Sequence, residues 1–342
     1  MPSSSQQKEG RLRVAVIGAG NMGKNHVRNY FMLPESDLVG VADANPEMKS
    51  LADEYKAAFF TDYKKMLDEL RPDAISVVVP TPFHFEVASE VMSRGIHCML
   101  EKPIAATVEE ADKLIECAEK NDVVLTVGHI ERFNPVIRKL KQMLDENIIG
   151  DITSVICRRV GGFPAVEPKT DVIIDLAVHD IDMVSYLLKS KPKSIMSHGS
   201  RTRHSSEVDS AEILMDYGRA SGFVQANWLT PVKIRKIALT GSEGYLEANY
   251  ITQELLYYKH NMKKVAKDGF TDFVLQVGNP EKKVIKVDFE EPLAVELKAF
   301  LARALGRTVS IVDPKDAREA LRVALEAVEP FKKKVKENKT QS

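Results

Sequence analysis

The sequence predicts an α/β protein of two domains, in which a parallel sheet covered by helices on both faces precedes an antiparallel or mixed sheet. Three observations predict it. Short apolar runs alternate with amphipathic stretches over residues 11–128, and consecutive strand-like runs joined by short turns appear within residues 129–330. The third is length, since 342 residues are too many for a single core.

The first half alternates strand-like and helix-like segments. Strands are predicted at residues 13–18, 38–43, 57–60, 74–79, 97–103 and 123–128. Helices are predicted between them at residues 22–32, 46–55, 63–70, 84–95 and 108–121. Such alternation is typical of a parallel sheet, because each connection must cross over the sheet to reach the next strand.

The second half has a different rhythm. A helix at 134–144 leads into a strand at 152–160, and further strands are predicted at 193–200, 211–218, 221–229, 235–241 and 244–250. Two helices close the chain, at 292–306 and 313–334; the second opens with Asp313 as N-cap and Pro314 as its first residue. We expect domains at residues 11–128 and 129–330, with polar tails at 1–10 and 331–342.

Composition excludes several classes of protein. The sequence is 44% hydrophobic and 28% charged, with 48 Lys and Arg against 49 Asp and Glu, so nothing indicates a nucleic-acid or membrane partner. No apolar run approaches the ~20 residues of a membrane span, and the first ten residues do not resemble a signal peptide. The scattered cysteines Cys98, Cys117 and Cys157 favour reduced thiols in the cytoplasm.

A glycine turn follows the first predicted strand. Gly18, Gly20 and Gly23 form a G-x-G-x-x-G pattern between an apolar strand and a helix, the context that such a pattern needs to bind a dinucleotide. Gly18 would make the tight turn, Gly20 would admit a pyrophosphate, and Gly23 would let the helix pack closely. The pyrophosphate would then lie at the N-terminus of the helix.

Asp43 ends the second predicted strand, twenty residues after Gly23. A carboxylate at this place accepts hydrogen bonds from the adenosine ribose. It would repel a 2′-phosphate, and the segment DANPE offers no Arg or Lys beside it. The sequence therefore favours NAD over NADP.

Two more predicted strands end in proline-containing segments. One runs into Pro80, Thr81 and Pro82, shortly before His84, and the other runs into Glu101, Lys102 and Pro103. Because ligands of open α/β sheets bind beyond the carboxyl ends of the strands, we expect both segments to contact the cofactor. A cis peptide before Pro103 would aim the Lys102 ammonium sharply.

The segment IIDLAVHDID, residues 173–182, places three acids and a histidine in an apolar run. Buried charges are costly unless paired, bound to metal or used, so a metal site, a catalytic cluster and a water-facing helix compete. On an α-helix, Asp175, His179 and Asp182 fall within about sixty degrees of one another. Asp180 points away, and a water-facing position fits Asp180 and Asp182. No second His/Asp cluster appears, so no metal site is expected.

Taken together, the motifs GAGNMGKNH, TPFHFEVA, EKPIA, ERFNP and DLAVHDID resemble the glucose-fructose oxidoreductase/inositol dehydrogenase/rhizopine catabolism (Gfo/Idh/MocA) family across residues 11–330. The resemblance implies a Rossmann domain followed by an α/β domain with a large open, mostly antiparallel sheet. It also implies oxidation or reduction of a carbinol on sugars or inositols with NAD or NADP, in homodimers or homotetramers formed through that sheet.

Roles carry over from the family residue by residue. Lys102 corresponds to the lysine near the reacting hydroxyl, and Asp175 and His179 correspond to the acid/base pair. VGHIERFNP, RRVGGFP and DVIIDLAVHDID are similar to the UDP-N-acetylglucosamine 3-dehydrogenase branch, whose members oxidise the 3-hydroxyl of the sugar to a ketone.

The sequence and the resemblance together imply two sets of site residues. Those expected to contact the cofactor are Gly18, Gly20, Asn21, Met22, Asp43, Thr81, Pro82, His84, Glu101 and Lys102. Those expected to contact the substrate are Glu131, Arg132, Arg159, Asp175 and His179. Arg158 and Lys169 are further candidates for a diphosphate, although strand alternation sends Arg158 and Arg159 to opposite faces.

Other functions remain open. A dehydrogenase of a free sugar or inositol is one alternative within the family. A catalytically silent NAD-binding regulator is another, but such a protein would be expected to lack Lys102 or His179. A metal-dependent hydrolase would need metal ligands from several segments.

Overall fold

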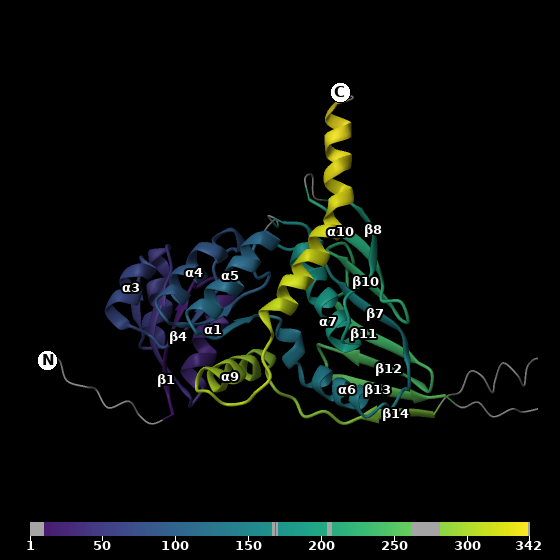
Figure 1. The fold of residues 1–342 in the computed structure, drawn as a ribbon, viewed down its shortest axis with the longest axis horizontal. Helices are drawn as coiled ribbons and strands as arrows, with labels where there is room; N and C mark the ends of the chain where they lie inside the picture. The colour runs from purple at the N-terminus through teal and green to yellow at the C-terminus, as the bar shows by residue number, and fades with distance from the viewer. Residues whose placement is uncertain (1–9, 166–167, 169, 204–206, 261–280, 341–342) are drawn as a thin grey trace, which may run out of the picture. The chain divides into compact units, whose positions relative to one another are not determined.

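The computed structural model describes residues 10–165, 168, 170–203, 207–260 and 281–340. The chain packs as two units (Figure 1). Unit 1 comprises Met1–Phe133 and Glu290–Arg322, and unit 2 comprises Asn134–Phe289 and Val323–Ser342.

Unit 1 is built on a six-stranded parallel sheet of order β3-β2-β1-β4-β5-β6, which confirms the parallel sheet predicted for the first half. Its strands are β1 Leu12–Ile17, β2 Ser36–Ala42, β3 Ala58–Phe60, β4 Ala74–Val77, β5 His97–Leu100 and β6 Leu125–Val127. The strand order reverses between β1 and β4, neighbours in the sheet that are not consecutive in the chain. Ligands of doubly wound sheets bind at this reversal, beyond the carboxyl ends of the strands.

Helices connect these strands: α1 Asn21–Met32, α2 Lys49–Glu54, α3 Tyr63–Leu70, α4 His84–Ser93 and α5 Val108–Lys120, with short 3-10 helices at Pro46–Met48 and Thr81–Phe83. A 3-10 helix at Ile130–Phe133 follows β6, and α9 Pro292–Ala304 joins unit 1 from later in the chain. Polar side chains cap the N-termini of some of these helices. Asp62 accepts from the N–H of Lys64 at the start of α3, and Thr107 accepts from the N–H of Glu110 at the start of α5.

Unit 2 is built on an eight-stranded sheet of order β14-β13-β12-β11-β7-β10-β9-β8. Its strands are β7 Ile152–Val160, β8 Ser194–Ser200, β9 Ser210–Asp216, β10 Ser221–Asn227, β11 Ile234–Gly241, β12 Gly244–Asn249, β13 Glu254–Lys259 and β14 Glu281–Ile285. Neighbouring strands are antiparallel except for β7 and β10, so the sheet is mostly antiparallel, as expected.

Helices cover one face of this sheet. α6 Pro135–Asp145 packs on β12 and β13, and α7 Val178–Leu188 packs on β7 and β10 (Figure 1). The last helix, α10 Pro314–Thr340, begins in unit 1, and its later part packs on β8, where Ser197 donates to the carbonyl of Ala327. Residues on the opposite face are more exposed, among them Met196, Leu214 and Ile156.

The start of α10 confirms a sequence prediction. Asp313 Oδ1 accepts from the backbone N–H of Lys315 at 2.8 Å, and Pro314 is the first helical residue. No helix in the described ranges combines the length and apolar character of a bilayer-spanning segment.

The observed units differ from the expected domains. Residues 129–133 and Glu290–Arg322 belong to unit 1, whereas the sequence placed residues 129–330 in one domain. Glu290–Arg322 is the larger of the two segments. The physical reason is α9, because Leu297 and Phe300 are fully buried in one apolar cluster with Val14 and Val27.

Candidate active site

The glycine turn lies between β1 and α1 in unit 1. Gly18 has a φ of +96°, and a Cβ there would come within 2.5 Å of the carbonyl oxygen of Val78, so only glycine fits. A Cβ on Gly23 would lie 2.0 Å from the carbonyl oxygen of Gly18, which explains the close approach of helix and turn.

Gly20 is different, because a Cβ there would meet no described atom within 4 Å. It is the N-cap of α1 and uses no side-chain cap, so the first-turn N–H groups, including those of Asn21 and Met22, are available to an anion. The turn therefore fits the pyrophosphate of a dinucleotide.

Asp43 lies just beyond β2 and contacts this turn. Its Oδ2 accepts from the N–H of Ala19 at 2.6 Å, and its Oδ1 accepts from the N–H of Asn45 at 2.8 Å. The carboxylate is thus fixed beside the glycine turn, where a ribose would follow the pyrophosphate.

The segment after β4 forms the 3-10 helix Thr81–Phe83, in which Pro82 is exposed. His84 follows it but is buried, with its ring nitrogens 2.8 Å from the carbonyl oxygen of Pro103 and 2.9 Å from that of Val79. Both ring nitrogens of His84 thus face the protein backbone, and the expected contact with the cofactor stays a prediction.

The segment after β5 contains the cis peptide bond Lys102–Pro103. Lys102 is half-buried, and its N–H donates to Oε2 of Glu101 at 3.2 Å. Glu101 is itself buried, and its Oε1 lies 3.2 Å from Nε2 of His26. The Glu101 carboxylate is therefore hydrogen-bonded within unit 1, and the expected contact of this residue with the cofactor stays a prediction.

In unit 2, the segment IIDLAVHDID does not form one continuous α-helix. Ile173–Ala177 is a π-helix, in which the N–H of Val178 donates to the carbonyl of Ile173, and α7 begins at Val178. Asp175 lies in the π-helix and His179 in the first turn of α7, and both are half-buried. Single π-turns often occur at functional sites.

The expectation that Asp180 and Asp182 face water is wrong. Asp180 is 1% exposed and Asp182 is 2% exposed. The reason for Asp180 is Arg159 on β7, whose Nε and Nη2 donate to the two carboxylate oxygens at 2.8 and 3.0 Å. A bidentate pair of this kind offsets the cost of burying both charges.

Arg159 was expected to contact substrate; the structure shows its contacts within unit 2, and the substrate contact stays a prediction. Its side chain is 6% exposed, pairs with Asp180, and lies over the ring of Tyr250 at 5.3 Å. Arg158 points to the other face, as alternation predicted, and donates to Gln225. The guanidinium of Arg159 is thus part of the interior of unit 2.

Two further substrate-site candidates, Glu131 and Arg132, lie at the end of the first chain segment of unit 1. Glu131 and Arg132 occupy the 3-10 helix Ile130–Phe133, and Arg132 donates to Asp316 at 2.8 Å. Their contact with a substrate stays a prediction. Lys169 lies outside the described residues.

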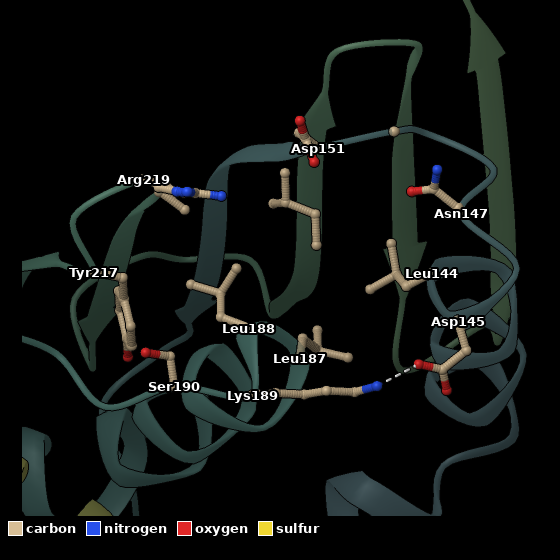
Figure 2. A pocket seen from close by; sticks show the side chains of 13 residues that line it. Leu144, Asp145, Asn147, Asp151, Leu187, Leu188, Lys189, Ser190, Tyr217 and Arg219 are labelled. Atoms are coloured by element: carbon tan, nitrogen blue, oxygen red, sulfur yellow. Dashed lines mark hydrogen bonds and ion pairs between the residues drawn. The ribbon is translucent and has the colours of Figure 1, made fainter.

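A pocket of about 410 Å³ lies in unit 2, and its lining includes neither Asp175 nor His179. Figure 2 shows it between the end of α6, the end of α7 and the turn from β9 to β10, with Lys189 paired to Asp145. Because α7 rises about 1.5 Å per residue, its C-terminal end is far from His179. Among the described residues no His, Cys, Asp and Glu side chains form a cluster that could hold a metal ion.

Comparison with known families decides the assignment. Residues 12–129 match a family model described as an oxidoreductase family with an NAD-binding Rossmann fold. Residues 137–247 match the model of the GFO/IDH/MocA C-terminal domain. The chain belongs to the GFO/IDH/MocA family.

Several relatives of the chain in the GFO/IDH/MocA family are named as dehydrogenases. The chain is 29% identical to UDP-N-acetylglucosamine 3-dehydrogenase of Acidithiobacillus ferrooxidans, over 94% of this chain and 98% of that protein. A structure of that enzyme has a TM-score of 0.82 and covers 94% of this chain and 99% of its own. The chain is also 26% identical to scyllo-inositol 2-dehydrogenase (NAD(+)) of Bacillus subtilis, over 95% of each.

The fold extends to more distant structures. Levoglucosan dehydrogenase in complex with NADH and levoglucosan has a TM-score of 0.80 at 20% identity, covering 93% of this chain and 96% of its own. The protein is therefore an NAD(P)-binding dehydrogenase of the GFO/IDH/MocA family, and the glycine turn of unit 1 has the geometry that such a cofactor requires.

Proposed function

We propose that the protein oxidises the 3-hydroxyl of UDP-N-acetylglucosamine to a ketone with NAD. The observation that carries this proposal is the similarity to the A. ferrooxidans enzyme, which spans nearly the whole of both chains. The positions of Lys102 after β5 and of Asp175 and His179 at the junction of the π-helix and α7 support it.

Oxidising a secondary alcohol requires the loss of a proton from oxygen and of a hydride from carbon. A bound nicotinamide cofactor supplies the hydride acceptor. His179 takes the proton, because an imidazole can exchange protons near neutral pH. The ammonium of Lys102 stabilises the negative charge that develops on oxygen. Asp175 orients the ring of His179 or holds a neighbouring hydroxyl of the substrate.

We propose NAD as the cofactor in preference to NADP. The carboxylate of Asp43 is held at the glycine turn by its hydrogen bond from the N–H of Ala19. A negative charge at this place repels a 2′-phosphate and accepts hydrogen bonds from a 2′-hydroxyl.

We also propose that two copies of the chain associate through the exposed face of the unit 2 sheet. Five strands place apolar side chains in one row across this face, in the paired order Met196, Leu214, Phe223, Ile156 and Ala238. Met196 is 72% exposed, and Leu214 and Ile156 are each 47% exposed. Contiguous exposed apolar surface of this kind is typical of a protein interface.

A second candidate is oxidation of an inositol. The support is the similarity to scyllo-inositol 2-dehydrogenase of B. subtilis, which also spans 95% of both chains. The same residues would perform the same chemistry on an inositol hydroxyl, so the substrate has to be decided by turnover of the two compounds under the same conditions.

Substitution of the two proposed catalytic groups tests the mechanism. We expect Lys102→Met and His179→Ala each to lower kcat by roughly 10²–10⁴-fold, since each removes a proton acceptor or a charge from the transition state. Because neither group is assigned to the pyrophosphate or ribose, NAD should bind with nearly unchanged affinity, measured by calorimetry.

Matched controls are Lys120→Met, at the end of α5, and His198→Ala, on β8 with a side chain 84% exposed. Both should turn over like the wild type. Unchanged turnover in Lys102→Met and His179→Ala would overturn the assignment of both residues.

A further inference from the structure

Two buried histidines contact the segment Glu101–Lys102–Pro103 from different helices. His26 lies in α1 and is 0% exposed, and His84 is the first residue of α4 and is 1% exposed. The proposed reaction uses neither ring. Both are nevertheless placed where a polar ring is costly to bury unless its nitrogens are hydrogen-bonded.

His26 joins the glycine-turn helix to Glu101. Its Nδ1 lies 2.9 Å from Oγ of Ser76, its Nε2 lies 3.2 Å from Oε1 of Glu101, and the hydroxyl of Tyr30 lies 2.8 Å from the same Ser76 Oγ. One arrangement of hydrogens satisfies the whole chain of contacts: Tyr30 donates to Ser76, Ser76 donates to His26 Nδ1, and His26 Nε2–H donates to Glu101.

Glu101, held by His26, in turn holds the backbone of Lys102. Its Oε2 accepts from the backbone N–H of Lys102, and its own N–H donates to the carbonyl of Val77. Burial raises the pKa of the Glu101 carboxyl, but the contacts with His26 and Lys102 outweigh burial and hold that pKa below its usual value. The carboxylate is also confined, because a Cβ on Gly128 would lie 3.0 Å from its Oε1.

His84 holds the other side of Lys102. Its Nδ1 lies 2.8 Å from the carbonyl oxygen of Pro103 and its Nε2 lies 2.9 Å from that of Val79. Both partners are acceptors, so each bond requires a ring N–H; the neutral ring makes one of them and the imidazolium makes both. The ring thus lies between the segment after β5 and the segment after β4, with one nitrogen facing a carbonyl oxygen of each.

We propose that His26 and His84 are positioning residues that hold the backbone of Lys102 from both sides. This inference rests on the role proposed for Lys102. The N–H of Lys102 is fixed through Glu101, and the carbonyl of the next residue is fixed through His84. An ammonium displaced by about 1 Å from the reacting oxygen costs on the order of 100-fold in rate, so loosening either contact lowers kcat.

Isosteric substitutions distinguish the hydrogen bond made by Nδ1 from the one made by Nε2 at each of the two histidines. A Gln amide can replace the Nε2 of a histidine and an Asn amide can replace the Nδ1. At residue 26 the bond that matters is made by Nε2, so His26→Gln should keep kcat within a fewfold of wild type, whereas His26→Asn should lower it by about 100-fold. At residue 84 the order reverses, because Nδ1 contacts Pro103: His84→Asn should retain activity and His84→Gln should lose it.

His97→Asn is the matched control. His97 lies at the start of β5, the strand that ends before Glu101, and its Nδ1 accepts from the N–H of Val124 at 3.0 Å. This histidine is far from Lys102 along the strand, so the variant should turn over like the wild type. The KM for substrate, the affinity for NAD and the thermal midpoint are measured in parallel, and the proposal predicts that kcat changes far more than any of them.

A second readout does not need the proposed substrate. The rate at which an amine-reactive reagent modifies Lys102 is followed by mass spectrometry in the protein without substrate. It should change in His26→Asn and His84→Gln and match wild type in His26→Gln and His84→Asn. If the wild type fails to oxidise UDP-N-acetylglucosamine, the proposed function fails, and this labelling pattern still decides the positioning role.

Two results would overturn the inference. One is an equal loss of kcat in the Asn and Gln variants at each position together with an equal fall in thermal midpoint, which indicates a packing role. The other is an unchanged labelling rate of Lys102 in all four variants.

Discussion

The carboxylate of Asp43 shows how a single residue can be fixed for recognition before any ligand arrives. Its two oxygens accept from the N–H groups of Ala19 and Asn45, at 2.6 and 2.8 Å. These bonds hold the carboxylate at the glycine turn in a defined orientation, so the ribose that we propose to bind there would not have to order it. Preorganisation of this kind reduces the entropic cost of binding.

Asp43→Asn tests the cofactor preference. The amide oxygen can still accept one backbone N–H, but the negative charge that repels a 2′-phosphate is gone. We expect the ratio of kcat/KM for NADP to that for NAD to rise about tenfold or more, a change of about 1.4 kcal/mol. The measurement is steady-state kinetics with each cofactor.

Asp53→Asn is the control, because Asp53 lies on the exposed surface of α2 and pairs with Lys49. It should leave the ratio unchanged. A ratio that stays at the wild-type value in Asp43→Asn would show that this carboxylate does not select the cofactor.

The structural role of some residues can be predicted from the sequence, and that of others cannot. Gly18 and Gly23 were predictable because a backbone constraint dictates the residue type locally. The pairing of Arg159 with Asp180 was not, since the partners lie 21 residues apart on a strand and a helix. An acid in an apolar run looks the same in sequence whether it faces water or a buried arginine. The contact of His26 with Glu101 was likewise not predictable from the sequence, because the two residues lie 75 positions apart and meet only in the folded chain.

Among the elements, the junction between the π-helix and α7 matters most for the site. A π-helix has more residues per turn than an α-helix, so the angle between Asp175 and His179 differs from the one expected at 3.6 residues per turn. The first turn of α7 is anchored to β7 by Asp180, the residue after His179. The ion pair thus fixes the backbone from which His179 projects.

Removal of one partner of this pair should destabilise the protein. Asp180→Ala leaves a buried guanidinium without its carboxylate, and we expect the free energy of unfolding to fall by about 3–5 kcal/mol. Replacing both partners, as Arg159→Met with Asp180→Leu, should recover most of the loss, because neither charge of the pair is then left buried. Urea unfolding followed by circular dichroism measures both.

The comparison pair is Lys236 and Glu247, which lie on the same sheet and are 44% and 28% exposed. Lys236→Ala should cost no more than ~1 kcal/mol. Equal losses in Lys236→Ala and Asp180→Ala would mean that the Arg159–Asp180 pair does not anchor α7.

The elements of unit 1 were predicted well because each strand is apolar and each helix amphipathic. Two strands of unit 2 were not predicted, β13 and β14. β14 reads EKKVI and is exposed along most of its length, so its place in the sheet comes from backbone pairing with β13 and leaves no apolar signal. Pairing between strands of this kind is a tertiary property.

At the scale of the whole molecule, the units do not follow the order of the chain. The alternation of strands and helices ends near residue 129 of the sequence, but the sequence does not show that α9 packs in unit 1. The apolar face of α9 would suit either sheet. Only its contacts, which bury Leu297 and Phe300 with residues of β1 and α1, decide between them.

The exposed apolar row of the unit 2 sheet predicts an oligomer. Light scattering coupled to size exclusion should give a dimer or a larger species for the wild type. Ile156 lies in this row between Phe223 and Ala238, and Ile156→Asp should shift the protein toward monomer, because a charge buried in an interface without a partner is costly. Met32→Asp, a 72% exposed methionine in α1, should leave the mass unchanged. A monomeric wild type would contradict the association.

The central claim is that the protein oxidises a sugar-nucleotide hydroxyl with NAD. Mass analysis of UDP-N-acetylglucosamine after incubation with the protein and NAD tests it most directly, because it detects a product even when the reduced cofactor stays bound. The account predicts a keto product lighter than the substrate by two hydrogen atoms, absent with His179→Ala. Recovery of the substrate at unchanged mass, under conditions in which an inositol is oxidised, would contradict it.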